Sequence, residues 1–223
     1  MRYLVATGIS ATEIVDLSDP TMSCLLEDIP FRYGSAGGLL GTTPVICGGQ
    51  DGSYEKLNDC LLYGTGQVIT MSYKRMYHSS VALNTSMIWI LGGNNGNKLD
   101  STELITINGA VNGPILPEAI DLSCAVKFIT TGDIYLVGGC NSSGPCPSNT
   151  VWVANPSNEL AFTQGPSLIS GRYKHQCGTM SIGTTKSIIV AAGGYNSNND
   201  DKYLTSVEIL DPLGEGNQWV PGK

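Results

Sequence analysis

The feature that most constrains this chain is an apolar run that ends in glycine and recurs five times. The runs end at Thr7-Gly8, Gly48-Gly49, Gly92-Gly93, Gly138-Gly139 and Gly193-Gly194. The last glycines of successive runs lie 41, 44, 46 and 55 residues apart. A period of about 40–50 residues with strand-like content is typical of repeat proteins whose unit is a small β-sheet, such as a propeller blade. We therefore expect an all-β chain in which each repeat forms one sheet.

The third repeat predicts how one such sheet is built. Residues 79–84 and 87–91 are two expected strands around a short turn, 101–107 is a third, and a weak fourth lies near 111–116. The second strand is apolar on both faces, which indicates that it is covered on both sides. The glycine doublet after it permits a sharp turn where side chains would clash. Four antiparallel strands in about 45 residues correspond to one blade.

Composition and charge narrow the range of partners. The 223 residues carry a net charge of −7, and no basic stripe is present. These properties argue against nucleic acid or an anionic membrane surface as partner. No apolar run approaches the roughly 20 residues that a membrane span requires, so we expect no membrane insertion.

Other residue types recur in step with the glycine doublets. The pattern R-x-x-H opens two repeats, and Arg32-Tyr-Gly-Ser35 is a degenerate copy. A glutamate recurs on the third strands, and an aromatic residue recurs on the fourth. The members of this set are Arg75 and His78, Arg172 and His175, the glutamates Glu13, Glu103 and Glu208, and Trp219 with Phe162 as its counterpart.

Together these residues resemble the kelch repeat family of β-propellers, and the resemblance covers essentially the whole chain. The cysteines Cys24, Cys47, Cys60, Cys124 and Cys177 beside these signals make the chain similar to the cysteine-containing kelch proteins of invertebrate animals. The resemblance implies four complete four-stranded blades after a partial one, within residues 1–30, 31–73, 74–117, 118–165 and 166–223. Since related propellers have six or seven blades, we expect a fragment of a larger ring. The alternative is a five-bladed ring that lacks one inner strand.

The repeated polar residues are interpreted as structural. His78 and His175 occupy the same repeat position, and the resemblance implies that each caps a blade junction by hydrogen bonding to backbone. The repeated glutamates are expected to bond turn amides around the doublets, because a catalytic carboxylate pair is normally unique. We therefore predict no catalytic residue, cofactor or metal site. The alternative is an enzyme of the galactose-oxidase type, which would need Tyr, Cys and two His around one metal.

Six of the seven cysteines can be paired from their positions. Cys47 and Cys60 lie on adjacent strands of one hairpin, and Cys140 and Cys146 bracket one loop. Cys124 and Cys177 hold the same first-strand position in neighbouring repeats, so they could link two blades. Cys24 is left over, either as a buried free thiol or with a partner upstream of Met1. No Cys-x-x-Cys pair is present, so zinc-ligand spacing is missing.

The function favoured by these patterns is a non-catalytic protein-binding or scaffold module. Its ligand, a protein or a carbohydrate, should bind loops rather than strands. The long polar loops after the doublets are 50–57, 94–100, 141–148 and 195–204. Paired cysteines and the sequons at Asn84 and Asn141 indicate an extracellular, glycosylated protein. The alternative is a cytoplasmic kelch adaptor whose other domains lie outside this chain.

Overall fold

The computed structural model describes residues 3–7, 12–16 and 25–27 as backbone strands, and 30–156, 158–183, 186–199 and 202–222 with their side chains. Within these ranges the chain forms β-strands, turns and loops and no helix, so the fold is all-β as expected. No helix of the described residues is long and apolar enough to cross a membrane. Gly8, at the first marker, and Cys24 lie outside the described residues.

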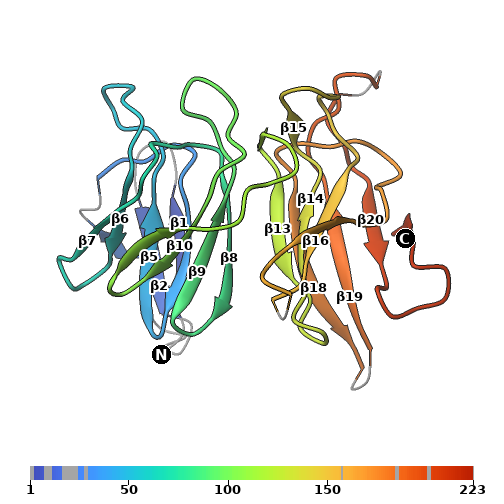
Figure 1. Ribbon diagram of the computed structural model, residues 1–223, viewed down its shortest axis with the longest axis horizontal. Coiled ribbons are helices and arrows are strands. Elements are labelled where there is room, and N and C mark those ends of the chain that lie inside the picture. The colour runs from blue at the N-terminus through green and yellow to red at the C-terminus, as the bar shows by residue number, and fades with distance from the viewer. Residues whose placement is uncertain are drawn as a thin grey trace.

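Four antiparallel sheets of four strands follow one another along the chain, each a meander in which consecutive strands pair (Figure 1). The first contains β4 (Ala36–Leu40), β5 (Thr43–Cys47), β6 (Asp59–Leu62) and β7 (Val68–Thr70). The second contains β8 (Ser79–Asn84), β9 (Met87–Leu91), β10 (Thr102–Thr106) and β11 (Gly109–Asn112). The third contains β13 (Cys124–Lys127), β14 (Ile134–Val137), β16 (Val151–Ala154) and β17 (Phe162–Gln164). The fourth contains β18 (Gln176–Ile182), β19 (Lys186–Ala192), β20 (Val207–Leu210) and β21 (Trp219–Pro221).

The described residues also form two smaller sheets. A three-stranded sheet at the N-terminal end contains β1 (Tyr3–Thr7), β2 (Thr12–Asp16) and β3 (Leu25–Glu27). A two-stranded sheet pairs β12 (Ile120–Asp121) with β15 (Cys140–Asn141). The repeated four-stranded meander is compatible with the blades of a β-propeller.

The second sheet differs from its expected form only at its last strand. β8, β9 and β10 lie where the pattern predicts them, but β11 pairs Gly109–Asn112 with β10 instead of the region near 111–116. The Gly113 amide still bonds to Thr102 O at 2.9 Å, in register with the preceding pairs, so the ladder continues one residue beyond Asn112. Pro114, which follows, has no amide hydrogen with which to extend a ladder.

The core lies between consecutive sheets. One buried cluster joins the first and second sheets, another joins the second and third, and a further cluster joins the third and fourth. Second strands supply residues to both neighbours: Ile88 and Ile90 pack toward the first sheet, and Trp89 and Leu91 toward the third. This alternation follows from the period of two along a strand.

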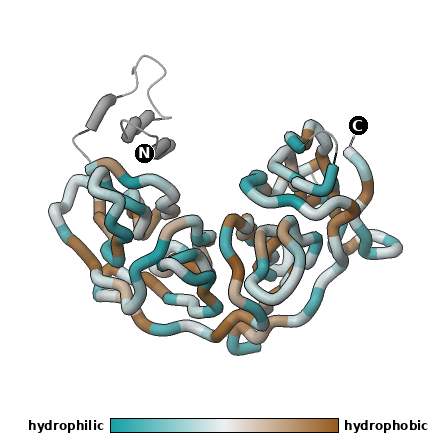
Figure 2. The backbone as a smooth tube through the Cα atoms, turned by 90° about the horizontal axis from the view of Figure 1, so that it is seen from above, coloured by the Kyte–Doolittle hydropathy of each residue, from teal (hydrophilic) through white to brown (hydrophobic). Residues whose placement is uncertain are grey.

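Seen from above, the four sheets lie side by side along an arc, and its open side separates the first sheet from the fourth (Figure 2). The first strands β4, β8, β13 and β18 contact one another in succession along the concave side. The loops that follow the glycine doublets gather at one edge of the sheets, at the top of Figure 1. We call this edge the loop edge; it is formed by the residues 50–57, 94–100, 141–148, 195–199 and 202–204.

Candidate functional site

A buried ion pair in the second sheet explains the repeated arginine and glutamate. Arg75 Nη2 lies 2.8 Å from Glu103 Oε1, and both side chains are fully buried. Arg75 Nη1 also donates to the carbonyl of Gly92, at 2.5 Å, and to that of Ser101, at 3.1 Å. The arginine thus ties the glycine turn of its sheet to the start of the third strand.

The fourth sheet repeats this contact set. Arg172 Nη2 lies 2.6 Å from Glu208 Oε1, and Arg172 Nη1 donates to Gly193 O at 2.7 Å and Ser206 O at 3.2 Å. Glu208 also accepts from the amide of Ile169 at 2.7 Å. Buried charges are tolerated when paired and hydrogen-bonded in this way. The side chains of Arg172 and Glu208 are therefore engaged in holding the strands of the sheet together.

The glutamates bond different amides from those expected. Glu103 accepts from the backbone amides of Ser72, at 2.6 Å, and Tyr73, at 3.3 Å, which lie in the segment entering the sheet. The glycine turn is bonded through its carbonyl by Arg75 instead. The side chain of Glu13 lies outside the described residues.

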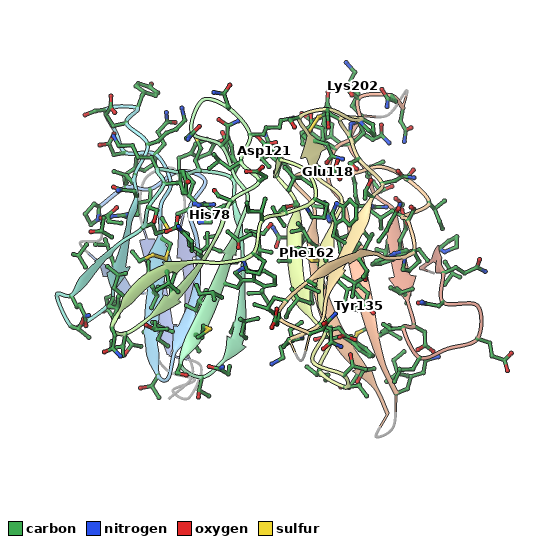
Figure 3. All side chains as sticks on the ribbon, in the orientation of Figure 1. His78, Glu118, Asp121, Tyr135, Phe162 and Lys202 are labelled. Atoms are coloured by element: carbon green, nitrogen blue, oxygen red, sulfur yellow. A yellow bond between two sulfur atoms is a disulfide. The ribbon has the colours of Figure 1, made fainter. Side chains whose placement is uncertain are left out.

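Each of the two histidines packs between the glycine doublets of neighbouring sheets. A Cβ added to Gly48 would lie 2.9 Å from His78 Cε1, and one added to Gly93 would lie 2.8 Å from His78 Cβ. His78 therefore occupies space that the doublets of two neighbouring sheets leave free. Figure 3 shows it inside the molecule, well below the loop edge.

His175 has the same position one junction further on, but neither histidine forms the expected hydrogen bond. The ring nitrogens of His78 and His175 have no hydrogen-bond partner among the described residues, which corrects that prediction. Burial, and then the charge of the neighbouring arginine, lowers the pKa of His78 to about 3 and that of His175 to about 4. Both therefore act as neutral space-filling rings at ordinary pH.

The first sheet has a different ion pair at this place, and in the third sheet the arginine is replaced. In the first, Arg32 pairs with Asp59 at 2.6 Å and donates to Gly48 O at 3.1 Å. In the third, buried Ile120 replaces the arginine, and Trp152 lies at the register position of the glutamate. The third sheet therefore lacks an ion pair at this place, and Trp152 Nε1 instead donates to Glu118 Oε1 at 2.8 Å.

Trp219 on β21 belongs to the same framework. It is buried between the third and fourth sheets, and its Nε1 donates to the carbonyl of Pro166 at 2.9 Å. It pairs in register with Leu210, as Phe162 pairs with Ala154 in the third sheet. The two aromatic residues thus hold equivalent fourth-strand positions.

Three disulfides join the six cysteines that the sequence pairs. Their partners are Cys47–Cys60, Cys124–Cys177 and Cys140–Cys146. The first links directly opposed residues of β5 and β6. The second links the first strands of the third and fourth sheets, and the third closes one loop of the loop edge.

The two sequon asparagines differ in exposure. Asn84 is exposed at the end of β8. Asn141 is only 4% exposed, and its Nδ2 donates to Ser148 Oγ at 3.2 Å. A glycan on that buried amide would not fit, so Asn84 is the better acceptor.

A polar pocket lies on the concave side, where the first strands meet. It has a volume of about 360 Å³ and is lined largely by residues of β4, β8, β13 and β18. Ser79 Oγ lies within hydrogen-bond distance of the carbonyl of Ser123, at 2.8 Å, and Ser80 Oγ donates to Gly37 O at 2.6 Å. These hydroxyls are used to join neighbouring sheets. Among the residues that the structure describes, no group of three or more His, Cys, Asp or Glu side chains could hold a metal ion.

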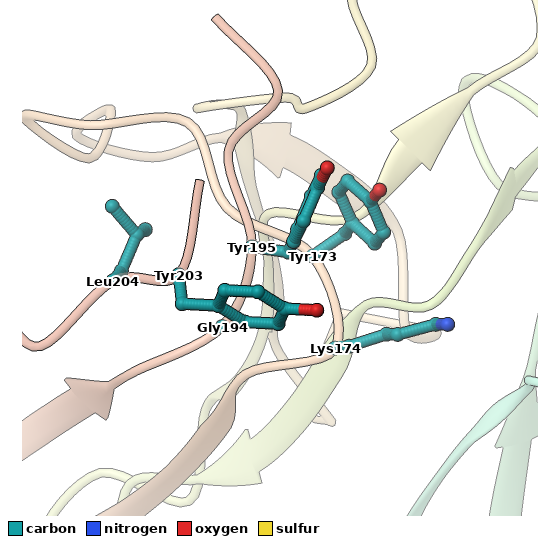
Figure 4. Close-up of a pocket in the computed structure, with 6 residues that line it drawn as sticks. All are labelled: Tyr173, Lys174, Gly194, Tyr195, Tyr203 and Leu204. Atoms are coloured by element: carbon teal, nitrogen blue, oxygen red, sulfur yellow. The ribbon is translucent and has the colours of Figure 1, made fainter. Parts of the chain in front are cut away.

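The loop edge carries a pocket that the sequence patterns do not single out. It has a volume of about 590 Å³ and is lined by Tyr173, Lys174, Gly194, Tyr195, Tyr203 and Leu204, which we call the tyrosine pocket (Figure 4). The sequence could have indicated this pocket only through the positions of two tyrosines. Tyr173 follows the arginine of the pattern R-x-x-H, and Tyr195 follows the glycine doublet. At the equivalent place on the first sheet, Phe31, Tyr33 and Tyr54 line a smaller pocket of about 320 Å³.

The fold and these contacts define the class of the molecule: a disulfide-linked, all-β repeat protein with aromatic pockets on one edge. No protein-family model matches the chain, and no curated protein matches it. Its function is therefore inferred from the residues of the site.

Proposed function

We propose that this chain is an arc of a kelch-type β-propeller that acts as a non-catalytic binding module and presents its loop edge to a protein partner. The observation that carries this proposal is a division of roles. The recurring Arg, Glu, Gly and His residues are engaged in joining strands and sheets, as for Arg75 and Arg172. Exposed aromatic residues such as Tyr54 and Tyr203 lie on loops, where binding residues are concentrated on rigid scaffolds.

The outer face of the fourth sheet supports the proposal that this arc belongs to a larger ring. Val190, Ile209 and Val220 are cross-strand neighbours on the face opposite to the packed residues Ile189 and Leu210. They form an apolar row, and Val220 is 44% exposed.

The corresponding face of the second sheet is packed against the sheet that follows it. Val190 is the third residue before its doublet, as Trp89 is in the second sheet. Trp89 is fully buried against the third sheet. A following blade would bury the row on the fourth sheet in the same way.

The disulfides support an extracellular location, because such bonds persist in oxidising compartments. One links strands within a sheet, one links two sheets and one closes a loop. An exposed sequon at Asn84 fits the same compartment.

The proposal is tested by placing a photo-crosslinking amino acid at Asn95 or Tyr54 on the loop edge. Thr42, exposed in the β4–β5 turn at the opposite edge, is the matched control position. We expect crosslinks to one secreted protein from the loop edge only, followed by direct binding of that purified protein. Crosslinking only from Thr42, or peroxide-producing oxidase activity after copper loading, would overturn the proposal.

A further inference from the structure

The tyrosine pocket is built from three cross-strand neighbours. Tyr173 pairs with Tyr195, which in turn pairs with Tyr203, in a short ladder beyond the fourth sheet. The ring centroids lie 5.2 and 5.3 Å apart, with interplanar angles of 57° and 84°. Since paired residues present their side chains on the same side, the three rings form one aromatic surface.

The fold does not require aromatic residues at these positions. The same ladder above the second sheet contains Met76, Asn94 and Lys98. Tyr203 is 74% exposed, although a ring of this size gains most when it is buried. Exposed aromatic surface beside polar groups is typical of binding sites.

Polar groups border this surface. Lys174 lines the pocket, and Figure 4 shows its ammonium and the Tyr203 hydroxyl extending in the same direction. The Lys174 backbone has a φ of 54° and is held by a hydrogen bond of 3.1 Å from its amide to Leu122 O. The pocket therefore offers flat aromatic faces with hydrogen-bonding groups at their rim.

The aromatic faces together with the Lys174 ammonium favour a sugar over a cationic ligand. A quaternary ammonium or methylated lysine would favour tyrosine faces, but it would meet the positive charge of Lys174. A pyranose ring has an apolar C–H face and hydroxyl groups around its edge, which complement ring faces and rim donors respectively. A volume of about 590 Å³ lies within the range of small-ligand pockets.

We propose that the tyrosine pocket is a carbohydrate-binding site, in which a sugar ring stacks on Tyr203 against Tyr195 and Lys174 binds one of its oxygens. This inference rests on the proposed binding function and names a ligand for one part of the loop edge. Carbohydrate is recognised here by shape and stacking, so the sugar is bound without any change in its covalent bonds.

Saturation-transfer NMR on the 223-residue chain tests the inference. The probes are lactose, chitotetraose, sialyllactose and a hyaluronan tetrasaccharide, which separate neutral sugars from carboxylate-bearing ones. We expect transfer to the C–H face of at least one sugar. Tyr203→Ala should weaken its affinity about tenfold, corresponding to the loss of one stacked ring. Lys174→Met should weaken it about threefold.

Ile129→Ala is the matched control, because Ile129 is a 59% exposed apolar residue between β13 and β14, away from the loop edge. It should leave the affinity unchanged within about twofold. Absence of transfer to all four sugars would overturn the inference, as would equal losses of affinity in Ile129→Ala and Tyr203→Ala. If no sugar binds while a protein still crosslinks to Asn95, the carbohydrate site fails and the binding module stands. If neither occurs, both proposals fail.

Discussion

At the scale of single residues, the framework uses two chemically different solutions at one position. Arg75 and Glu103 form a fully buried ion pair, whereas Ile120 and Trp152 occupy the corresponding places in the third sheet. A buried ion pair has a large desolvation cost, so replacing both partners by apolar residues is often neutral. Removing one partner leaves a buried charge and is strongly unfavourable.

Arg75→Met should therefore lower the free energy of unfolding by about 3–5 kcal/mol, because Glu103 would remain buried without its cation. The double variant Arg75→Ile/Glu103→Trp, which copies the third sheet, should be more stable than Arg75→Met. Guanidinium unfolding monitored by tryptophan fluorescence measures both values. A double variant less stable than the single one would contradict this account of the pair.

The histidines predict an acid-dependent loss of stability. Their folded-state pKa values of about 3 and about 4 lie below the ordinary value of 6.5, so the unfolded state binds protons first as pH falls. Stability is then fully present above pH 6.5 and falls by about 1.4 kcal/mol per pH unit for each histidine down toward pH 4.

Unfolding measured at pH 7.0, 6.0 and 5.5 tests this dependence before most carboxylates titrate. His78→Gln/His175→Gln is the control, and it should remove most of the slope in that interval. An unchanged slope in the double variant would show that the two rings are not the titrating groups.

At the scale of elements, the glycine doublets were the part of the fold most open to prediction. Gly48, Gly93 and Gly194 have positive φ, and a side chain there would collide with a neighbouring histidine or backbone. This local requirement is visible in sequence because it allows only one residue type. The sequence could not predict that the ring nitrogens of His78 have no hydrogen-bond partner among the described residues, because this depends on how two sheets pack.

The tyrosine pocket also depends on contacts that could not be predicted from the sequence. Tyr173 precedes β18, whereas Tyr195 and Tyr203 lie toward the two ends of one loop, and the three meet only because short ladders extend the sheet beyond its doublet. The pattern placed residues 195–204 on an exposed loop without indicating this pairing. Sequence periodicity therefore predicts the strands, whereas contacts among loop residues need the folded chain.

Gly194→Ala tests the steric argument at a doublet. Its Cβ would lie 2.8 Å from both His175 Cβ and Tyr173 O, at a φ of 98°. We expect a destabilisation of roughly 2–4 kcal/mol from strain and displacement of these atoms. The control is Gly178→Ala on β18, where a Cβ would meet nothing within 4 Å. Equal effects of the two substitutions in thermal unfolding would contradict the argument.

At the scale of the whole molecule, stability comes from interfaces between successive sheets, as in other repeat proteins. The Cys124–Cys177 disulfide reinforces one of these interfaces across a sequence separation of 53 residues. By contrast, no further sheet of the described residues packs on the outer face of the fourth sheet, which carries Val190, Ile209 and Val220.

Removing the inter-sheet disulfide should be costly. Cys124→Ser/Cys177→Ser should lower the free energy of unfolding by about 4 kcal/mol, because the unfolded chain regains the entropy of a large loop. Calorimetry compares this variant with the native chain. Cys140→Ser/Cys146→Ser, which opens a loop with a separation of 6 residues, should have a smaller effect.

Sedimentation velocity of the 223-residue chain tests the open arc most directly. An unclosed arc exposes the apolar row of the fourth sheet, so the chain should self-associate at tens of micromolar. Val190→Lys/Ile209→Lys should restore a monomer with an unchanged circular dichroism spectrum. A compact monomer formed by the native chain over the same concentrations would contradict the open arc and favour a closed five-bladed ring.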